Sequence, residues 1–192
     1  MSVVDYLKTV AGFRRAQPTC GPERSKYMCF EEFVLEHGHP YQSQPLTKNE
    51  WRIFLTAARS ALRQVRRKDF PIKMCFSNSQ RIVLADPSNE LRYAEGYVSS
   101  IIPIHHGWVD LNGKVIDVTL RTHPKYDGEP FDRQHFPDRA IGEIPACRDY
   151  YGLTFADREV TEFVEETSSL GSLIDDPARG WPLIRFGRTV KP

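Results

Sequence analysis

Residues 92–122 read RYAEGYVSSIIPIHHGWVDLNGKVIDVTLRT, and this stretch decides the fold. At its centre, Asn112-Gly113 is the strongest short signal for a two-residue type I′ turn, because both residues tolerate a positive φ. With this pair in the turn, the pairing register runs outward as far as His106 opposite Thr119. The stretch therefore predicts an antiparallel hairpin.

Alternation of side chains divides this hairpin into two faces. One face carries His106, Trp108, Asp110, Val115, Asp117 and Thr119. The other is mostly apolar and carries His105, Gly107, Val109, Ile116 and Val118. His106 and Asp117 become diagonal neighbours, about 7–8 Å apart at Cα, whereas His105 points away from the acid. A carboxylate that holds an imidazole is typical of a general base, so the register selects His106.

Cys75 is the nucleophile that we predict for this base. Pro71 interrupts the preceding helix, and apolar residues then recur at helical spacing until Asp86-Pro87. Cys75 is therefore expected at the N-terminus of a helix, where the helix dipole favours a thiolate. Together with His106 and Asp117 it predicts nucleophilic catalysis by a Cys-His-Asp triad.

The order of these motifs resembles the transglutaminase-like branch of the papain-like cysteine hydrolases. The matching residues are Cys75; Arg92-Tyr93 with Gly96-Tyr97; His106-Gly107-Trp108-Val109; and Asp117-Val118-Thr119. The resemblance implies an α+β fold of the transglutaminase-like, papain-like type, with N-terminal helices and a nucleophile helix packed on an antiparallel sheet. It also implies protease, amidase, deamidase or acyltransferase activity.

The sequence departs from this family at positions that matter for the chemistry. Val118 stands where the family usually has proline, and Lys73-Met74 replace the small residues before the cysteine. The backbone N–H of Cys75 supplies one expected oxyanion donor. The second oxyanion donor is left open, with Asn78, Gln64 and Gln80 as candidates. We assign Trp108, Asn78 and Tyr97 to the substrate-binding wall, with Trp108 mainly a packing residue.

Composition fits one globular domain. Of 192 residues, 40% are hydrophobic and 27% are charged, with a net charge of +1. We expect a domain over residues 1–170 with an N-terminal helical part at 1–68, and a tail at 171–192 docked on it. The near-neutral charge argues against nucleic acid, and no apolar run is long enough for a membrane span. No signal peptide is visible, so we expect a cytoplasmic protein.

Four cysteines are too few for a disulfide scaffold. Cys20, Cys29, His37 and His39 form a conceivable zinc set, but their spacing matches no standard finger. We therefore predict no metal and no cofactor for the catalytic site. Whether these four residues bind a metal ion is left open.

Periodicity and capping signals predict the remaining elements. Helices are expected over 2–13, 28–36, 47–68 and 156–166, and further strands over 91–99 and 150–155, with a loop at 39–45. The helix at 47–68 opens on a Thr47–Glu50 capping box and presents an arginine-rich face. That face consists of Arg52, Arg59, Arg63 and Arg66. It is either a solvated surface or a patch for an anionic partner.

The segment 121–149 is a long polar loop that follows the predicted triad. It is either a substrate-binding rim or a solvated insertion. Its many charges are poorly suited to shielding an acyl-enzyme from water, so we expect hydrolysis rather than cross-linking.

Two functions follow. The first is a cysteine hydrolase of the protease, amidase or deamidase type, acting on a protein or peptide-like amide through an acyl-enzyme. The alternative is a non-catalytic protein-binding module that uses the 121–149 loop and the arginine-rich face. The substrate and the oligomeric state are left open.

Overall fold

A five-stranded antiparallel sheet forms the centre of the part of the chain that the structure describes. The computed structural model describes residues 1–16, 25–41, 44, 46–68, 70–71, 73–121 and 148–188. The strands are β1 (His39–Tyr41), β2 (Arg92–Val98), β3 (Ile104–Leu111), β4 (Lys114–Ile116) and β5 (Tyr150–Phe155). They pair in the order β1-β5-β2-β3-β4, and every pair is antiparallel. The predicted α+β class is confirmed.

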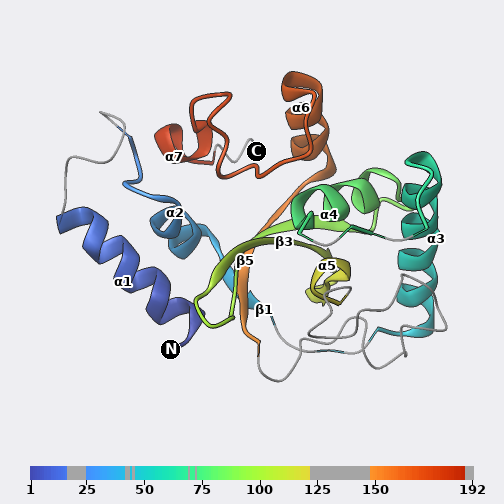
Figure 1. Ribbon diagram of the computed structural model, residues 1–192, viewed down its shortest axis with the longest axis horizontal. Coiled ribbons are helices and arrows are strands. Elements are labelled where there is room, and N and C mark those ends of the chain that lie inside the picture. The colour runs from blue at the N-terminus through green and yellow to red at the C-terminus, as the bar shows by residue number, and fades with distance from the viewer. Residues whose placement is uncertain are drawn as a thin grey trace.

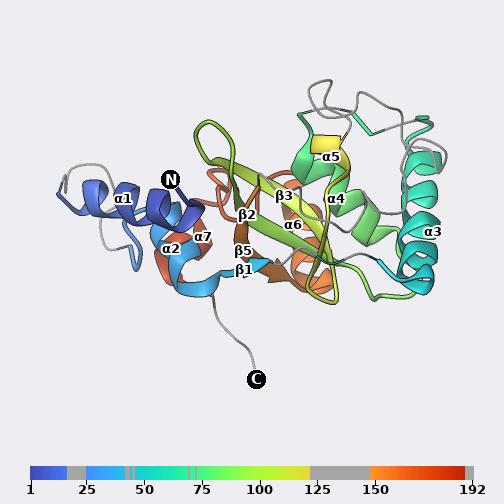
Figure 2. The ribbon, with the colours of Figure 1, turned by 90° about the horizontal axis from the view of Figure 1, so that it is seen from below.

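Helices surround this sheet (Figure 1). They are α1 (Val3–Ala16), α2 (Phe30–His37), α3 (Lys48–Gln64), α4 (Cys75–Leu84), α5 (Val118–Arg121), α6 (Asp157–Thr167) and α7 (Pro182–Phe186). Seen from below, α1 and α2 lie at one end and α3 at the opposite end, with the sheet between them (Figure 2). Among these helices α4 makes the most extensive contact with β3. The sheet therefore positions α4, and with it Cys75.

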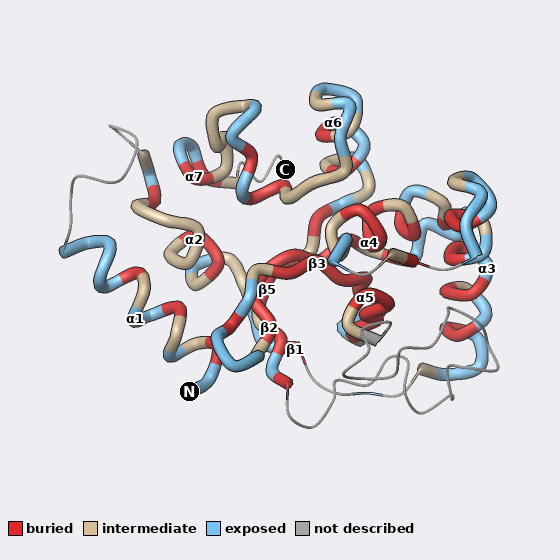
Figure 3. Tube along the Cα trace, in the orientation of Figure 1, coloured by how far each residue is buried: buried red, intermediate tan, exposed pale blue. Residues whose placement is uncertain are grey.

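Both faces of the sheet are buried. The larger core includes Tyr93, Tyr97 and Val109 from the sheet together with apolar residues of all the helices. A smaller cluster on the other face includes Trp108 and Tyr150. Accordingly β2 is buried along its whole length after its first residue, as the tube in Figure 3 shows for the central strands. Tyrosine and tryptophan supply much of this buried surface.

The hairpin has the turn that the sequence predicts. Asn112 and Gly113 both have positive φ, of 56° and 81°, and Val109 pairs with Ile116 in the predicted register. The prediction that the strand continues to Thr119 is wrong, because β4 ends at Ile116 and α5 begins at Val118.

Asp117 explains why the strand ends there. Its Oδ1 atom accepts hydrogen bonds from the backbone N–H groups of Thr119 and Leu120, at 3.0 and 2.9 Å. A side-chain oxygen that accepts from the second and third residues after it is a helix N-cap. The residue that the sequence places in a strand instead starts a helix.

The predicted capping box of α3 is confirmed. Thr47 Oγ1 accepts from the backbone of Glu50, whose carboxylate accepts from the backbone of Thr47. The same Glu50 carboxylate accepts from Lys114 Nζ at 2.6 Å and from Asn112 Nδ2 at 3.2 Å. The start of α3 is therefore fastened to the tip of the hairpin.

Two local predictions need correction, and the tail contains a helix that the sequence does not predict. The helix predicted over 47–68 ends at Gln64, and the chain then reverses through Arg66 in the left-handed region at φ 56°. The predicted loop 39–45 contains β1, which is short and pairs with β5 at the edge of the sheet. The aperiodic tail contains α7, which begins at a proline. The elements β1 and α7 have too few residues to show a hydrophobic period in the sequence.

Gly107 allows α4 to approach β3 closely. A Cβ atom on this residue would lie 2.9 Å from Phe76 Cδ1 and 3.1 Å from the Tyr93 hydroxyl. Ser79 Oγ donates to the Gly107 carbonyl at 3.1 Å. These contacts hold the first two turns of α4 against the middle of the sheet.

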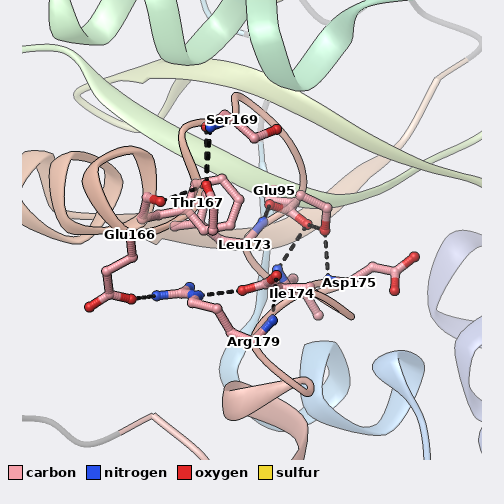
Figure 4. Close-up of polar contacts among 11 residues, drawn as sticks. Glu95, Glu166, Thr167, Ser169, Leu173, Ile174, Asp175 and Arg179 are labelled. Carbon is pink, nitrogen blue, oxygen red and sulfur yellow. Dashed lines mark hydrogen bonds and ion pairs between the residues drawn. The ribbon is translucent and has the colours of Figure 1, made fainter.

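The segment 171–174 closes over a buried carboxylate (Figure 4). Glu95 is fully buried in β2. Its carboxylate accepts from the backbone N–H groups of Leu173 and Ile174, at 2.9 and 3.3 Å, and from the Ser172 hydroxyl. Hydrogen bonds to an ionised carboxylate are stronger than hydrogen bonds between neutral groups. These donors therefore anchor the tail to the sheet.

We predict that Glu95→Gln weakens this anchor. Burial raises the pKa of Glu95, but the bonds from His105, Ser172 and Leu173 together hold it below the ordinary value of 4.5. The stabilisation is therefore complete above about pH 4.5 and is lost as pH falls through the lower pKa of the folded state. The variant should lose about 2 kcal/mol of unfolding free energy at pH 7 and lose this acid-dependent slope. Urea denaturation between pH 3 and pH 7 measures both.

The matched control is Glu162→Gln. Glu162 pairs with Arg158 on an exposed face of α6, so its loss should cost no more than about 0.5 kcal/mol. Equal stability of the two variants at pH 7 would contradict the anchoring role of Glu95.

Candidate active site

Cys75 is the first residue of α4, as the sequence predicts. The chain enters the helix through a tight turn in which Lys73 has a φ of 62°, an uncommon conformation for a residue other than glycine. Asn78 fastens this turn, because its backbone N–H donates to Met74 O and its side chain donates to Pro71 O, both at 2.8 Å. The Cys75 thiol is half-buried at the start of the helix.

His106 and Asp117 form a buried pair. His106 Nε2 lies 2.7 Å from Asp117 Oδ2, and both side chains are almost completely buried. The short β4 makes this possible: it pairs with β3 only from Val109 to Leu111. The chain therefore turns beside the unpaired half of β3 and brings Asp117 to His106.

Tyr150 is a further partner of this acid. Its hydroxyl, at the start of β5, donates to the same Asp117 Oδ2 atom at 2.7 Å. The sequence does not predict this contact, because Tyr150 lies 33 positions from Asp117 and no local motif links them. Only the strand order, which puts β5 beside β2, could have identified this contact.

Cys75 and His106 also interact. Burial lowers the pKa of His106, but the Asp117 carboxylate and a side-chain hydrogen bond with Cys75 together raise it to about 10. Since Nε2 faces Asp117, the other ring nitrogen is the one left for the sulfur. Asp117 shows the complementary shift: burial raises its pKa, but His106, the Leu120 N–H and Tyr150 hold it below its usual value. The His106 ring therefore lies between the Asp117 carboxylate and the Cys75 sulfur, and the carboxylate keeps the pKa of the ring above its ordinary value.

His105 has a separate environment, as the predicted register requires. Its Nε2 atom lies 2.8 Å from Glu95 Oε1, and its ring stacks on Tyr97 and meets the edge of Phe76. It therefore belongs to the larger core beneath α4. The prediction that the two histidines face opposite sides is confirmed.

Asn78 is not placed to act as an oxyanion donor. Its amide group donates to Pro71 O and to Thr119 Oγ1, each at 2.8 Å, so both amide hydrogens are used inside the protein. Of the other two candidates, Gln64 is exposed at the end of α3. Gln80 is buried and donates to Gly171 O at 2.5 Å. Asn78 instead joins α4 to α5.

Trp108 and Tyr97 also have structural roles. Trp108 is fully buried on the smaller-cluster face, in edge contact with Tyr41 and Tyr150. Tyr97 is buried in the larger core, and its hydroxyl donates to Glu31 at 2.8 Å. Both side chains are buried in this structure, and their assignment to a substrate-binding wall stays a prediction.

The conceivable zinc residues do not assemble in the described part of the chain, where no group of three metal-ligating side chains occurs. Burial raises the pKa of Cys29 to about 11, and His37 is bonded to the Tyr27 hydroxyl at 2.7 Å. Cys20, Cys147 and most of the predicted 121–149 loop lie outside the described residues.

Comparison with known proteins adds no relative: no family model, curated protein or solved structure matches the chain. None of the helices in the described residues is long and apolar enough to cross a membrane.

We predict that His106 is protonated up to a pH of about 10 and that this depends on Asp117. In Asp117→Asn only burial and the thiol act on the ring, so the pKa of His106 should fall toward its ordinary value of 6.5 or below. Because the pKa is raised in the folded protein, its stabilisation is complete below about pH 6.5 and disappears as pH rises through 10. NMR titration of the imidazole carbons measures the shift.

Asp157→Asn is the control for this titration, since Asp157 pairs with Arg92 away from the site. It should leave the His106 titration unchanged. An unshifted His106 titration in Asp117→Asn would contradict the assigned pairing.

Proposed function

We propose that the protein is a cysteine hydrolase that cleaves an amide bond of a protein or peptide substrate, with Cys75, His106 and Asp117 as its catalytic residues. The observation that carries this proposal is the contact between a helix-terminal thiol and an imidazole that is held by a buried carboxylate. The resemblance to transglutaminase-like, papain-like enzymes agrees with it. The α+β arrangement, with α4 packed on an antiparallel sheet, is compatible with that fold.

In the proposed reaction the Cys75 proton lies on His106, so Cys75 Sγ attacks the substrate carbonyl carbon as a thiolate, and the carbonyl electron pair moves to oxygen. The His106 imidazolium then gives a proton to the departing amine as the C–N bond breaks, which leaves a thioester on Cys75. A water molecule attacks this thioester and transfers a proton to His106. The C–S bond then breaks, which releases the acid and returns Cys75 Sγ as a thiolate. Asp117 stays ionised throughout and holds the ring.

The start of α4 supplies the stabilisation of the oxyanion in this proposal. The first N–H groups of a helix have no partner within the helix and point toward its N-terminal end. The backbone N–H groups of Cys75 and Phe76 occupy these positions. They replace the side-chain donor that we sought at Asn78, and the positive end of the helix dipole favours the same negative charge.

We predict that Cys75 is alkylated by iodoacetamide at pH 6 about tenfold or more faster than Cys29, because a neighbouring cation stabilises a thiolate. Cys29 is an internal reference, since burial holds its pKa at about 11. His106→Ala should remove the advantage of Cys75, and His105→Ala should preserve it. Mass spectrometry of the labelled peptides gives both rates. Equal rates in the unmodified protein would fit a non-catalytic binding module instead.

The reaction itself is tested with a peptide library and mass spectrometry of the products. The intact protein should form an acyl adduct on Cys75 that hydroxylamine removes. Cys75→Ala should lower the rate of cleavage by about a thousandfold or more, while Cys29→Ala should leave it unchanged. Cleavage that survives Cys75→Ala would refute the proposed nucleophile, and stable transfer to an added amine would show an acyltransferase.

A further inference from the structure

A cavity lies next to the proposed nucleophile. It has a volume of about 380 Å³ and is enclosed by the end of α3, the turn before α4 and the first two turns of α4. Met74, which directly precedes Cys75, lines it, and so does Asn78 one turn further on. The cavity therefore lies against the turn that directly precedes Cys75.

Two arginines from different elements converge on this cavity. Arg67 follows the end of α3, and Arg81 lies on α4. Arg81 Nε donates to Ser77 Oγ at 3.2 Å, which orients the guanidinium and leaves its two terminal nitrogens for other partners. Within the described residues, no carboxylate forms an ion pair with either arginine. The rest of the wall is mainly apolar and includes Phe70 and Pro71.

An arginine pair above an apolar wall suits a side chain that has an aliphatic stem and a carboxylate end. A guanidinium binds a carboxylate through two parallel hydrogen bonds, which gives direction as well as charge. The dipole of α3 also stabilises cations near its C-terminal end, and this accounts for Arg63 in its last turn. It does not account for Arg81, which belongs to α4 and turns toward the same cavity.

The spacing along α4 fits a substrate held at Cys75. Arg81 is six positions after Cys75, a rise of about 9 Å along the helix. An extended peptide covers this distance in about three residues. A carboxylate that reaches Arg81 would therefore belong to a residue near the cleaved bond rather than to a distant part of the substrate.

We propose that this cavity is the specificity site of the enzyme and binds the side chain of an aspartate or glutamate close to the cleaved amide bond. The inference rests on the proposed hydrolase function, for which the cavity would select acidic substrates. The arginines bind the carboxylate, and the apolar wall contacts the stem. They act through substrate binding and take no part in the bond-breaking steps.

The test uses a fluorogenic peptide library with glutamate, glutamine or lysine fixed in turn at each of three positions on either side of the cleaved bond. At one position, glutamate should raise kcat/KM about tenfold over glutamine, mainly through KM, and lysine should lower it. Arg81→Gln and Arg67→Gln should each reduce the ratio of kcat/KM for glutamate over glutamine peptides. Arg59→Gln, on the exposed face of α3, is the matched control and should keep the preference.

A second measurement separates this inference from the proposed function. Fluorescence anisotropy of the same peptides on Cys75→Ala reports binding without chemistry, and glutamate should again be favoured in a manner that depends on Arg81. Cleavage without any preference for glutamate would overturn the specificity site but leave the hydrolase standing. Absence of cleavage with Arg81-dependent binding would overturn the hydrolase but leave an acidic-peptide site. A gain that follows a free C-terminal carboxylate rather than a side chain would also overturn the inference.

Discussion

The buried carboxylate of Asp117 is the constraint on which this structure depends. A buried ionised group is costly unless every oxygen is paired. Its two oxygens accept from His106 Nε2, from the Tyr150 hydroxyl and from two backbone N–H groups of α5. These donors come from β3, β5 and α5. One charge therefore ends the hairpin, starts a helix and holds the imidazole that we assign to catalysis.

Glu95 meets the same requirement on the other face of the sheet. Its partners are His105, the Tyr93 hydroxyl and the donors of segment 172–174. Two neighbouring histidines are thus held by two different carboxylates, because successive side chains of a strand point to opposite faces. His106 also interacts with the Cys75 thiol. The alternation of a single strand separates a proposed catalytic histidine from a structural one.

The position of α4 connects these buried charges to the surface. The absence of a side chain at Gly107 admits Phe76, so the helix lies close to β3 and carries Cys75 to the level of His106. Asn78 then fixes the turn before the helix and the start of α5 at once. The cavity beside Met74 opens where these elements meet. The placement of the proposed nucleophile and that of the proposed specificity site therefore depend on the same few contacts.

What the sequence by itself determined was local. The Asn112-Gly113 turn, the Thr47 capping box and the start of α4 at Cys75 depend on neighbouring residues, through allowed φ angles and short-range hydrogen bonds. Strand alternation was enough to select His106 over His105. The tertiary structure decided the rest. Asp117 leaves the strand because donors from three elements are available to its carboxylate. Tyr150 reaches it from 33 positions away, and Glu95 is capped by residues 77 to 79 positions further along the chain. Such contacts leave no period or motif in the sequence, since they form only when the strands are already in order.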